Sequence, residues 1–190
     1  MKVKMPRPKT QSDEKVLAAA HRLIHQEGPE ALTFARLAQA CGLAPATLVQ
    51  RFKTKAGLMQ ATLLYAWDGL DAKTAQLAAS MPRTPQGAVR LLTALSGDYG
   101  GIESYAEGLL ILREDLRDPV LRARGTAWRR ALSEALDRCF SGIPSAPKDV
   151  GLLMATHWQG SLLWWGFEPE EDVARFVEKS LKRFVAAISA

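Results

Sequence analysis

The sequence is poor in cysteine and histidine and contains no long apolar run. Only two cysteines and three histidines occur among its 190 residues. Cys41 and Cys139 lie far apart without metal-ligand spacing, so we expect two core thiols in a reducing cytosol rather than a disulfide. No apolar run has transmembrane length, and no apolar segment follows the basic N-terminus, as a signal peptide would require. We therefore expect a cytoplasmic protein.

Catalytic arrangements are also missing from the sequence. No Ser-His-acid or Cys-His set can be argued from residue order or spacing. The turn at 97–101 lacks the preceding strand and the following Lys-Ser/Thr of a phosphate loop. His21 and His25 are four residues apart and could in principle chelate a metal, but no third ligand is identifiable, so surface histidines are the favoured interpretation. We predict no enzyme activity, no metal site and no cofactor.

Positive charge is concentrated in the first third of the chain. Residues 1–65 contain ten Lys or Arg and four Asp or Glu, whereas residues 66–190 contain fifteen and sixteen. The excess of +6 in the first segment therefore accounts for more than the whole net charge of +5. Affinity for DNA depends on cations that replace condensed counterions, so this asymmetry favours a nucleic-acid partner at the N-terminal end.

Residues 33–52 are typical of two short helices joined by a tight turn. Thr33 can cap the first helix, and Gly42 can supply the positive φ that ends it. Pro45 suits the first turn of a second helix, whose Leu48 points inward. This is the pattern of a helix-turn-helix, whose second helix enters the DNA major groove. Any compact helical corner could produce the same pattern, so the neighbouring segments have to decide.

Those neighbouring segments resemble the tetracycline-repressor (TetR) family of bacterial transcription regulators. The resemblance covers about residues 12–66 and is carried by the segments 16–28, 31–38, 42–48 and 52–58. It implies an all-α protein of about nine helices, with a three-helix DNA-binding head and a larger body for ligand binding and dimerisation. We place the head at residues 1–60, with 1–11 as a flexible arm, and the body at 61–190.

The resemblance also implies which residues touch DNA. Thr33, Thr47, Arg51 and Lys55 match family positions that contact phosphate. Gln50 is suited to a bidentate adenine contact. The family's usual polar or glycine residues are replaced by Ala44, Pro45 and Ala46, and its usual Tyr by Val49, which favours apolar contact with thymine methyl groups.

The rest of the chain reads as helices, with no persistent strand alternation. A long helix from Lys55 to about Ala79 links the head to the body. The other expected helices cover residues 12–27, 85–97, 102–116, 120–140, 148–166 and 170–188. The arginines of segment 120–140 are interpreted as a solvated face.

Segment 148–166 is apolar on most sides and has to be covered on two faces. The simplest cover is a second copy of the last two helices, packed across a two-fold axis, as in the family that the chain resembles. The candidate dimer residues are Leu153, Gly160, Trp164, Phe176, Leu181 and Phe184. Whether Trp164 and Trp165 face the pocket or the partner stays open, because adjacent helix positions point about 100° apart.

In the resembling family a small molecule in the helical body changes the separation of the two heads. Five large aromatic residues in this body favour an apolar cavity. The candidate lining residues are Trp67, Tyr99, Tyr105, Leu109, Trp128, Met154 and Trp158. A mostly apolar, ring-containing effector is the expected ligand.

The leading hypothesis is a ligand-responsive, homodimeric repressor that binds a near-palindromic DNA operator. A helical enzyme with a helix-turn-helix corner would need a catalytic set, which is missing. A TetR-like interaction protein that has lost specific DNA binding is a more serious alternative, because the reading helix lacks its usual polar residues. The basic first third argues against that alternative.

Overall fold

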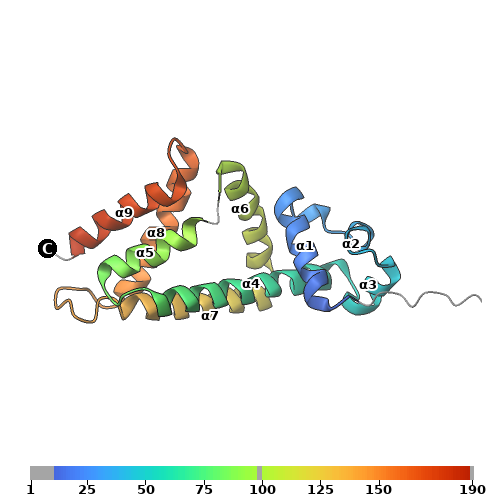
Figure 1. Ribbon diagram of the computed structural model, residues 1–190, viewed down its shortest axis with the longest axis horizontal. Coiled ribbons are helices and arrows are strands. Elements are labelled where there is room, and N and C mark those ends of the chain that lie inside the picture. Colours follow the sequence, from blue (N-terminus) through green and yellow to red (C-terminus); the bar gives the residue numbers. More distant parts are fainter. Residues whose placement is uncertain (1–10, 98–99, 189–190) are drawn as a thin grey trace, which may run out of the picture.

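A computed structural model describes residues 11–97 and 100–188 of the chain. Figure 1 shows a small N-terminal head beside a larger helical body, with one long helix, α4, running from the first into the second. Nine α-helices and one 3-10 helix form the regular structure of the described residues, without a strand. The predicted all-α class and helix number are confirmed. Residues 1–10 of the predicted arm 1–11, and Tyr99, lie outside the described residues.

The head is built from three helices whose ends follow local sequence signals. Ser12 and Thr33 cap the first and second helices through their hydroxyl groups, and Gly42 ends the second at φ 62°. Pro45 occupies the first turn of the third helix, where its missing N–H leaves no bond unmade. The bounds are α1 Asp13–Glu27, η1 Pro29–Ala31, α2 Phe34–Cys41 and α3 Pro45–Phe52.

The body contains the remaining six helices. Their bounds are α4 Lys55–Ser80, α5 Pro85–Ser96, α6 Ile102–Arg117, α7 Pro119–Asp137, α8 Val150–Phe167 and α9 Val173–Ile188. The helix expected from residue 170 begins only at Val173, because the Asp172 carboxylate accepts the Arg175 N–H at 3.0 Å and starts the helix there. The helix expected to reach Phe140 ends at Asp137, and Phe140 continues in a turn, buried in the core.

Two hydrophobic cores hold these helices together. The head core includes Ile24 of α1, Leu48 of α3 and Leu58 of α4, all without exposed surface, and Ile111 of α6 packs against it. The body core is formed mainly by α5, α7, α8 and α9, and the middle and end of α4 pack against it. Since α4 contributes to both cores, the boundary near residue 60 remains a prediction.

Helices α7 and α8 approach so closely that only glycine fits at one position. A Cβ on Gly151 would lie 2.1 Å from the Ser133 carbonyl oxygen. The Gly151 N–H instead donates to the Asp137 carboxylate at 2.7 Å. This contact fixes α8 against α7 at the start of the helix.

Both cysteines are buried free thiols, as the sequence predicts. No helix within the described ranges is both long and apolar enough to cross a bilayer.

Candidate DNA interface and effector site

The helix-turn-helix consists of α2, the turn at Cys41–Ala44, and α3. The Leu43 N–H donates to the Ala38 carbonyl at 3.0 Å and closes the turn after Gly42. Leu37 and Leu48 have no exposed surface, so α2 and α3 are locked together by their inner faces. The opposite face of α3 is therefore held in a fixed orientation toward solvent.

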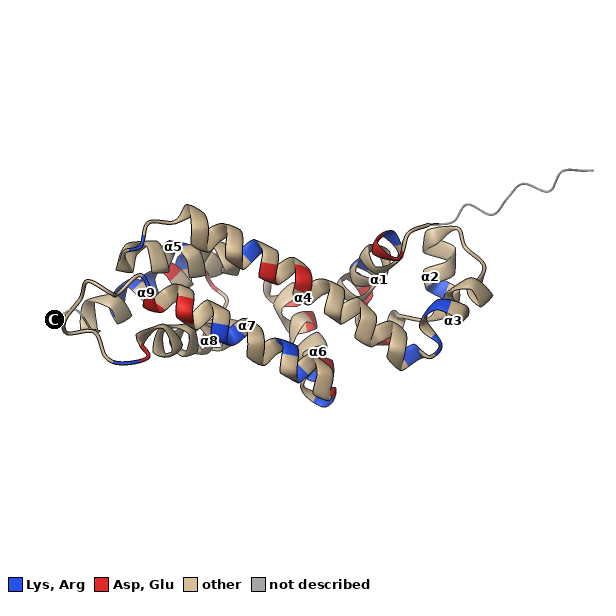
Figure 2. Ribbon diagram, turned by 90° about the horizontal axis from the view of Figure 1, so that it is seen from below, with Lys and Arg blue, Asp and Glu red and all other residues tan. Residues whose placement is uncertain are grey.

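Most of the predicted reading residues lie on that outer face. Ala44, Pro45, Ala46, Val49 and Gln50 are exposed, and Thr47 is half-buried. Figure 2 shows Lys and Arg positions, in blue, on α2, α3 and the start of α4, at the end of the molecule away from the body. This surface combines small apolar side chains with one amide, and positive charge surrounds it.

Arg51, a predicted phosphate contact, is engaged within the head in this conformation. Its guanidinium donates to the Gln11 carbonyl at 2.8 Å and to the Asp13 carboxylate at 3.0 Å. Its side chain is only 20% exposed. Contact with a phosphate would require these two bonds to break.

The other predicted phosphate contacts are partly engaged within the head. The Thr33 hydroxyl accepts the Arg36 N–H as the cap of α2. Lys55 donates to Glu30 at 2.9 Å, and this hydrogen bond lowers the pKa of the Glu30 carboxyl. Because Glu30 is 94% exposed, the pair is a weak surface bridge that a phosphate can replace.

Lys53 is an additional cation at this surface that was not predicted from the sequence. It lies exposed in the turn between α3 and α4 with a φ of 65°, an unusual conformation for a residue with a side chain. Its position between two predicted contacts, Arg51 and Lys55, was the available signal.

Three tryptophans form a ladder through the body. The ring centres of Trp67 and Trp128 are 5.8 Å apart, and those of Trp128 and Trp158 are 6.3 Å apart. Each indole N–H is bonded: Trp67 to Asp115, Trp128 to Thr74 and Trp158 to Ser96, at 2.8–3.0 Å. Burial raises the pKa of the Asp115 carboxyl despite the bond from Trp67.

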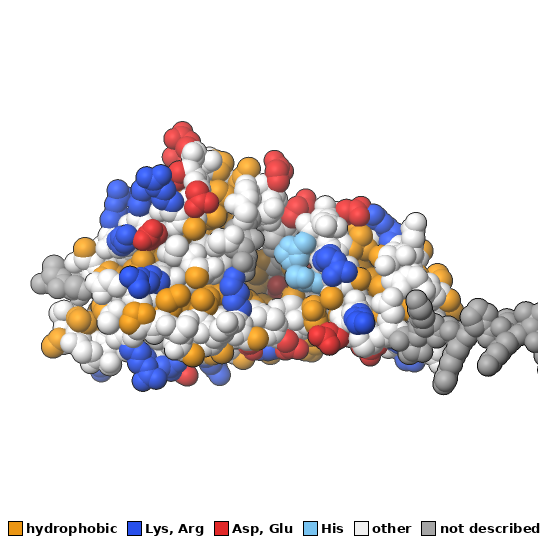
Figure 3. All heavy atoms as spheres, viewed as in Figure 1, with side chains coloured by type: hydrophobic (Ala, Val, Ile, Leu, Met, Phe, Trp, Pro, Cys, Tyr) orange, Lys and Arg blue, Asp and Glu red, His pale blue; other side chains and the backbone are white. Residues whose placement is uncertain are grey.

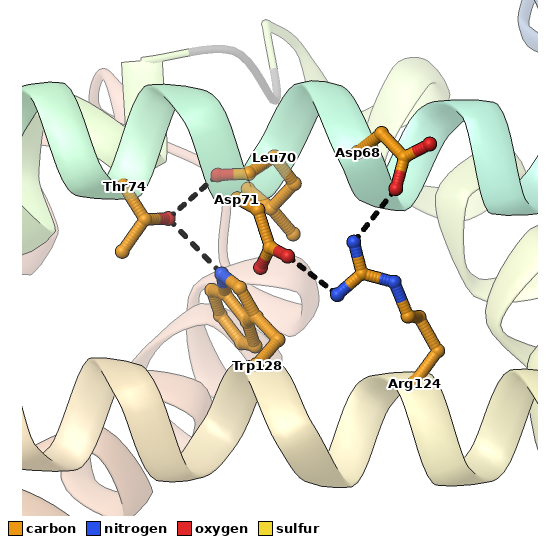
Figure 4. Close-up of polar contacts among 6 residues, drawn as sticks. All are labelled: Asp68, Leu70, Asp71, Thr74, Arg124 and Trp128. Atoms are coloured by element: carbon orange, nitrogen blue, oxygen red, sulfur yellow. Dashed lines mark hydrogen bonds and ion pairs between the residues drawn. The ribbon is translucent and has the colours of Figure 1, made fainter.

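Beside these tryptophans, α7 is joined to α4 by ion pairs. Arg124 of α7 reaches across to Asp68, at 2.7 Å, and to Asp71, both on α4, while Trp128 donates to Thr74 one turn farther on (Figure 4). Arg124 is therefore half-buried and paired, rather than part of a solvated face as predicted. The remaining arginines of α7 are exposed.

Only some of the predicted lining residues lie together. Trp67, Trp128 and Trp158 are neighbours, whereas Tyr105 packs against Trp165 with ring centres 5.9 Å apart. Leu109 is 42% exposed on α6. Met154 has no exposed surface and Trp158 has 2%, so this conformation leaves no space for a ligand beside them. A ligand at these two positions would require the core to open.

The head matches a known family. Residues 16–62 match the model of the bacterial regulatory proteins of the TetR family. The head is therefore a TetR-family domain. The match spans α1 to the start of α4, including the whole helix-turn-helix.

Three solved structures share the fold over nearly the whole chain. The TetR family transcriptional regulator PfmR from Thermus thermophilus is 22% identical, with a TM-score of 0.61 over 92% of this chain and 97% of its own. The multidrug binding protein EbrR, complexed with malachite green, is 20% identical, with a TM-score of 0.66 over 95% and 99%. AibR, in complex with isovaleryl coenzyme A and operator DNA, is 22% identical, with a TM-score of 0.61 over 92% and 96%. A comparison with curated protein sequences gives no match.

Head and body meet at a groove of about 580 Å³. Its lining comes from the η1 segment, the start of α4, the end of α6 and the start of α7. Across it the Gln60 amide donates to the Asp118 carboxylate at 2.8 Å and lowers the pKa of that carboxyl. Asp118 also caps α7. One side chain therefore connects the base of the reading head to a body helix.

The outer face of α8 is an exposed apolar stripe. Leu153, Leu163, Trp164 and Phe167 are between 45% and 72% exposed. Gly160, half-buried, lies on the same face at helical spacing. Trp165, by contrast, is 3% exposed and donates its N–H to the Glu171 carbonyl. Within the protomer, Trp164 therefore faces outward and Trp165 faces the core.

The α9 residues predicted at the dimer contact are less exposed. Phe176 and Phe184 are half-buried and pack against the body core, and Phe184 stacks on His157 with ring centres 5.0 Å apart. Leu181 has no exposed surface. Leu181 is therefore not part of the candidate interface. The α9 stripe formed by Val173, Val177 and Leu181 faces the protomer's own core.

Proposed function

We propose that this protein is a ligand-responsive, homodimeric transcriptional regulator that represses from a near-palindromic operator in the cytoplasm. The observation that carries the proposal is the outer face of α3, exposed and surrounded by the chain's excess positive charge. A helix presented in this way fits the major groove, with Gln50 on a base edge and Lys55 on phosphate. We assign the protein no catalytic role.

The proposed dimer forms through α8 and α9. Monomers rarely leave a contiguous apolar surface of this kind exposed, and a two-fold axis covers it with its own copy. The stripe of Leu153, Gly160, Trp164 and Phe167 forms the centre, with Phe176 and Phe184 at its side. Two heads held in this way can read half-sites that repeat at about 34 Å along one face of DNA.

The proposed effector is a mostly apolar, ring-containing molecule that enters beside the tryptophan ladder. EbrR and AibR, which share this fold, bind malachite green and isovaleryl coenzyme A respectively, which supports a small-molecule role for the body. Displacement of Trp128 would act on Thr74 and, through the Arg124 bridges, on α4, whose first turn carries Lys55. A coupling free energy of about 1–3 kcal/mol is enough to change operator affinity 5- to 150-fold.

The alternative is an interaction protein that has lost specific DNA binding. The apolar start of α3 and the engaged Arg51 favour it. The two functions differ in sequence discrimination, so a test has to compare binding sites rather than measure binding alone.

The decisive experiment selects operators from random DNA and then measures Gln50→Ala and Gln39→Ala on the recovered site. Gln39 is exposed on α2, so it controls for loss of one surface amide. We expect Gln50→Ala to lose about 1–3 kcal/mol of discrimination at one base pair per half-site and Gln39→Ala to lose none. Failure to recover any operator, with equal binding to all DNA, would favour the interaction protein.

A further inference from the structure

The imidazoles of His21 and His25 meet on the free face of α1. Their Nε2 atoms are 3.0 Å apart, with ring centres 4.4 Å apart. His25 is exposed, and His21 is half-buried beside Tyr65 of α4, with ring centres 6.4 Å apart. Figure 3 shows the pale-blue histidine side chains of α1 at the rim of a hollow between the head and the body. Solvent and ions therefore reach the pair.

The two rings are within hydrogen-bonding distance, but the contact is bent rather than linear. A strong bond needs the donor N–H and the acceptor lone pair close to one line, which would put the ring centres roughly 5.3 Å apart at this nitrogen separation. The observed separation of the ring centres is 4.4 Å, so the N–H or lone-pair directions are inclined to the line that joins the two nitrogens. When both lone-pair directions incline to the same side, they converge on one point beside the line between the two Nε2 atoms.

A metal ion at that point has ordinary bond lengths. With metal–nitrogen distances of about 2.1 Å, nitrogens 3.0 Å apart subtend an angle of roughly 90° at the metal. That angle suits cis positions of an octahedral or square-planar ion, whereas a tetrahedral ion would need the nitrogens about 3.4 Å apart. Ni²⁺ and Cu²⁺ prefer the first geometry and Zn²⁺ the second.

We propose that His21 and His25 form a two-imidazole chelating site for a divalent transition-metal ion, preferring Ni²⁺ or Cu²⁺ to Zn²⁺. No group of three His, Cys, Asp or Glu side chains that could hold a metal occurs among the described residues. Water therefore fills the remaining coordination positions. The sequence spacing alone offered no third ligand and favoured surface histidines, but the nitrogen separation supplies the chelate geometry with two.

The surroundings of the pair disfavour its protonation. Burial, the neighbouring His25 and Arg22 lower the pKa of His21 to about 4, and burial lowers the pKa of His25. At the end of the same helix, Glu107 of α6 has a buried Oε2 without a hydrogen-bond partner among the described residues, 3.1 Å from the Cβ position of Gly28.

The test titrates Ni²⁺ into the untagged full chain by calorimetry. Ni²⁺ is the better probe because Cu²⁺ oxidises thiols and the chain has two. We expect one Ni²⁺ per chain in the wild type and at least about tenfold weaker binding in both His21→Ala and His25→Ala. His157→Gln, which alters the third histidine far along the chain, should bind as the wild type does. Melting temperatures verify that each variant is folded.

Two further measurements complete the test. Cu²⁺ bound to His157→Gln should give an electron paramagnetic resonance spectrum of an ion coordinated by two imidazole nitrogens. Zn²⁺ should bind more weakly than Ni²⁺. Equal Ni²⁺ binding by the wild type and both alanine variants, or no Ni²⁺ binding by the wild type at millimolar concentration, would overturn the site. Tighter binding of Zn²⁺ than of Ni²⁺ would overturn the proposed geometry.

Discussion

The guanidinium of Arg51 in α3 donates to the carboxylate of Asp13 in α1 at 3.0 Å. This bond ties the reading helix to the first helix of the head. It also holds a cation that the TetR resemblance assigns to phosphate. Asp13 is 68% exposed on its side chain, so the pair is partly screened and can exchange with another anion.

Asp13→Asn is therefore expected to increase DNA affinity. It releases Arg51 for a phosphate and should steepen the dependence of log K on log salt by about 0.9 for each phosphate that Arg51 newly neutralises, one in each subunit. Glu14→Gln is the matched control, because it removes the same charge from the same first turn of α1 without touching Arg51. Titrations of an operator fragment at several salt concentrations measure both. Equal slopes for the two variants would show that Arg51 stays away from phosphate.

The sequence predicts those features of the head that depend on neighbouring residues. The caps at Ser12 and Thr33, the left-handed Gly42 and the proline start of α3 each follow from a few adjacent positions, and all are present. The Arg51–Asp13 pair joins residues 38 apart in the chain. Periodicity sets the direction of the Arg51 Cα–Cβ bond, but not where a long side chain finds its partner.

The effector and dimer surfaces were harder to predict for the same reason. Trp164 and Trp165 are both large, apolar and helical, so local chemistry gives no reason to bury one and expose the other. The choice comes from Tyr105 and the Glu171 carbonyl, which meet Trp165 only in the folded chain. Leu181 was misassigned because a single apolar stripe on α9 can face its own core or a partner equally well.

Trp164→Glu is expected to produce a folded monomer. Trp164 is 70% exposed in the protomer, so the substitution leaves the protomer core intact, but a charge buried without a partner at the proposed interface costs several kcal/mol. Sedimentation should show monomers, and circular dichroism should show unchanged helicity. Ala131→Glu, on an exposed position of α7, introduces the same charge elsewhere and should remain dimeric. Aspartate at Phe176 and Phe184 should instead lower the melting temperature, because both rings pack on the core.

The lowered pKa of His21 predicts a pH dependence of stability. The folded chain keeps this imidazole neutral down to about pH 4, whereas the unfolded chain protonates it near 6.5. Between these values the unfolded state binds more protons, so the free energy of unfolding falls as the pH is lowered. His21→Gln removes this contribution. Its melting temperature, measured with a chelator present, should fall less between pH 7 and pH 5 than that of the wild type. An equal or larger fall would mean that His21 is protonated normally in the folded protein.

Trp128 is the residue at which effector binding should be visible, because its ring lies between Trp67 and Trp158 and its N–H bonds to Thr74 of α4. An effector found by thermal-shift screening should, at 100 times its Kd, raise the free energy of unfolding by about 2.7 kcal/mol and quench tryptophan fluorescence. Trp128→Phe should remove most of the quenching and weaken release of the operator, with operator affinity unchanged in the absence of effector. Trp164→Phe is the matched control, since it removes one exposed indole from the outer face of α8 and should leave the effector response intact. The opposite result, with quenching lost in Trp164→Phe and kept in Trp128→Phe, would place the effector at the α8 surface instead of beside the three stacked tryptophans. The proposed coupling through Thr74 and Arg124 to the reading head would then be wrong.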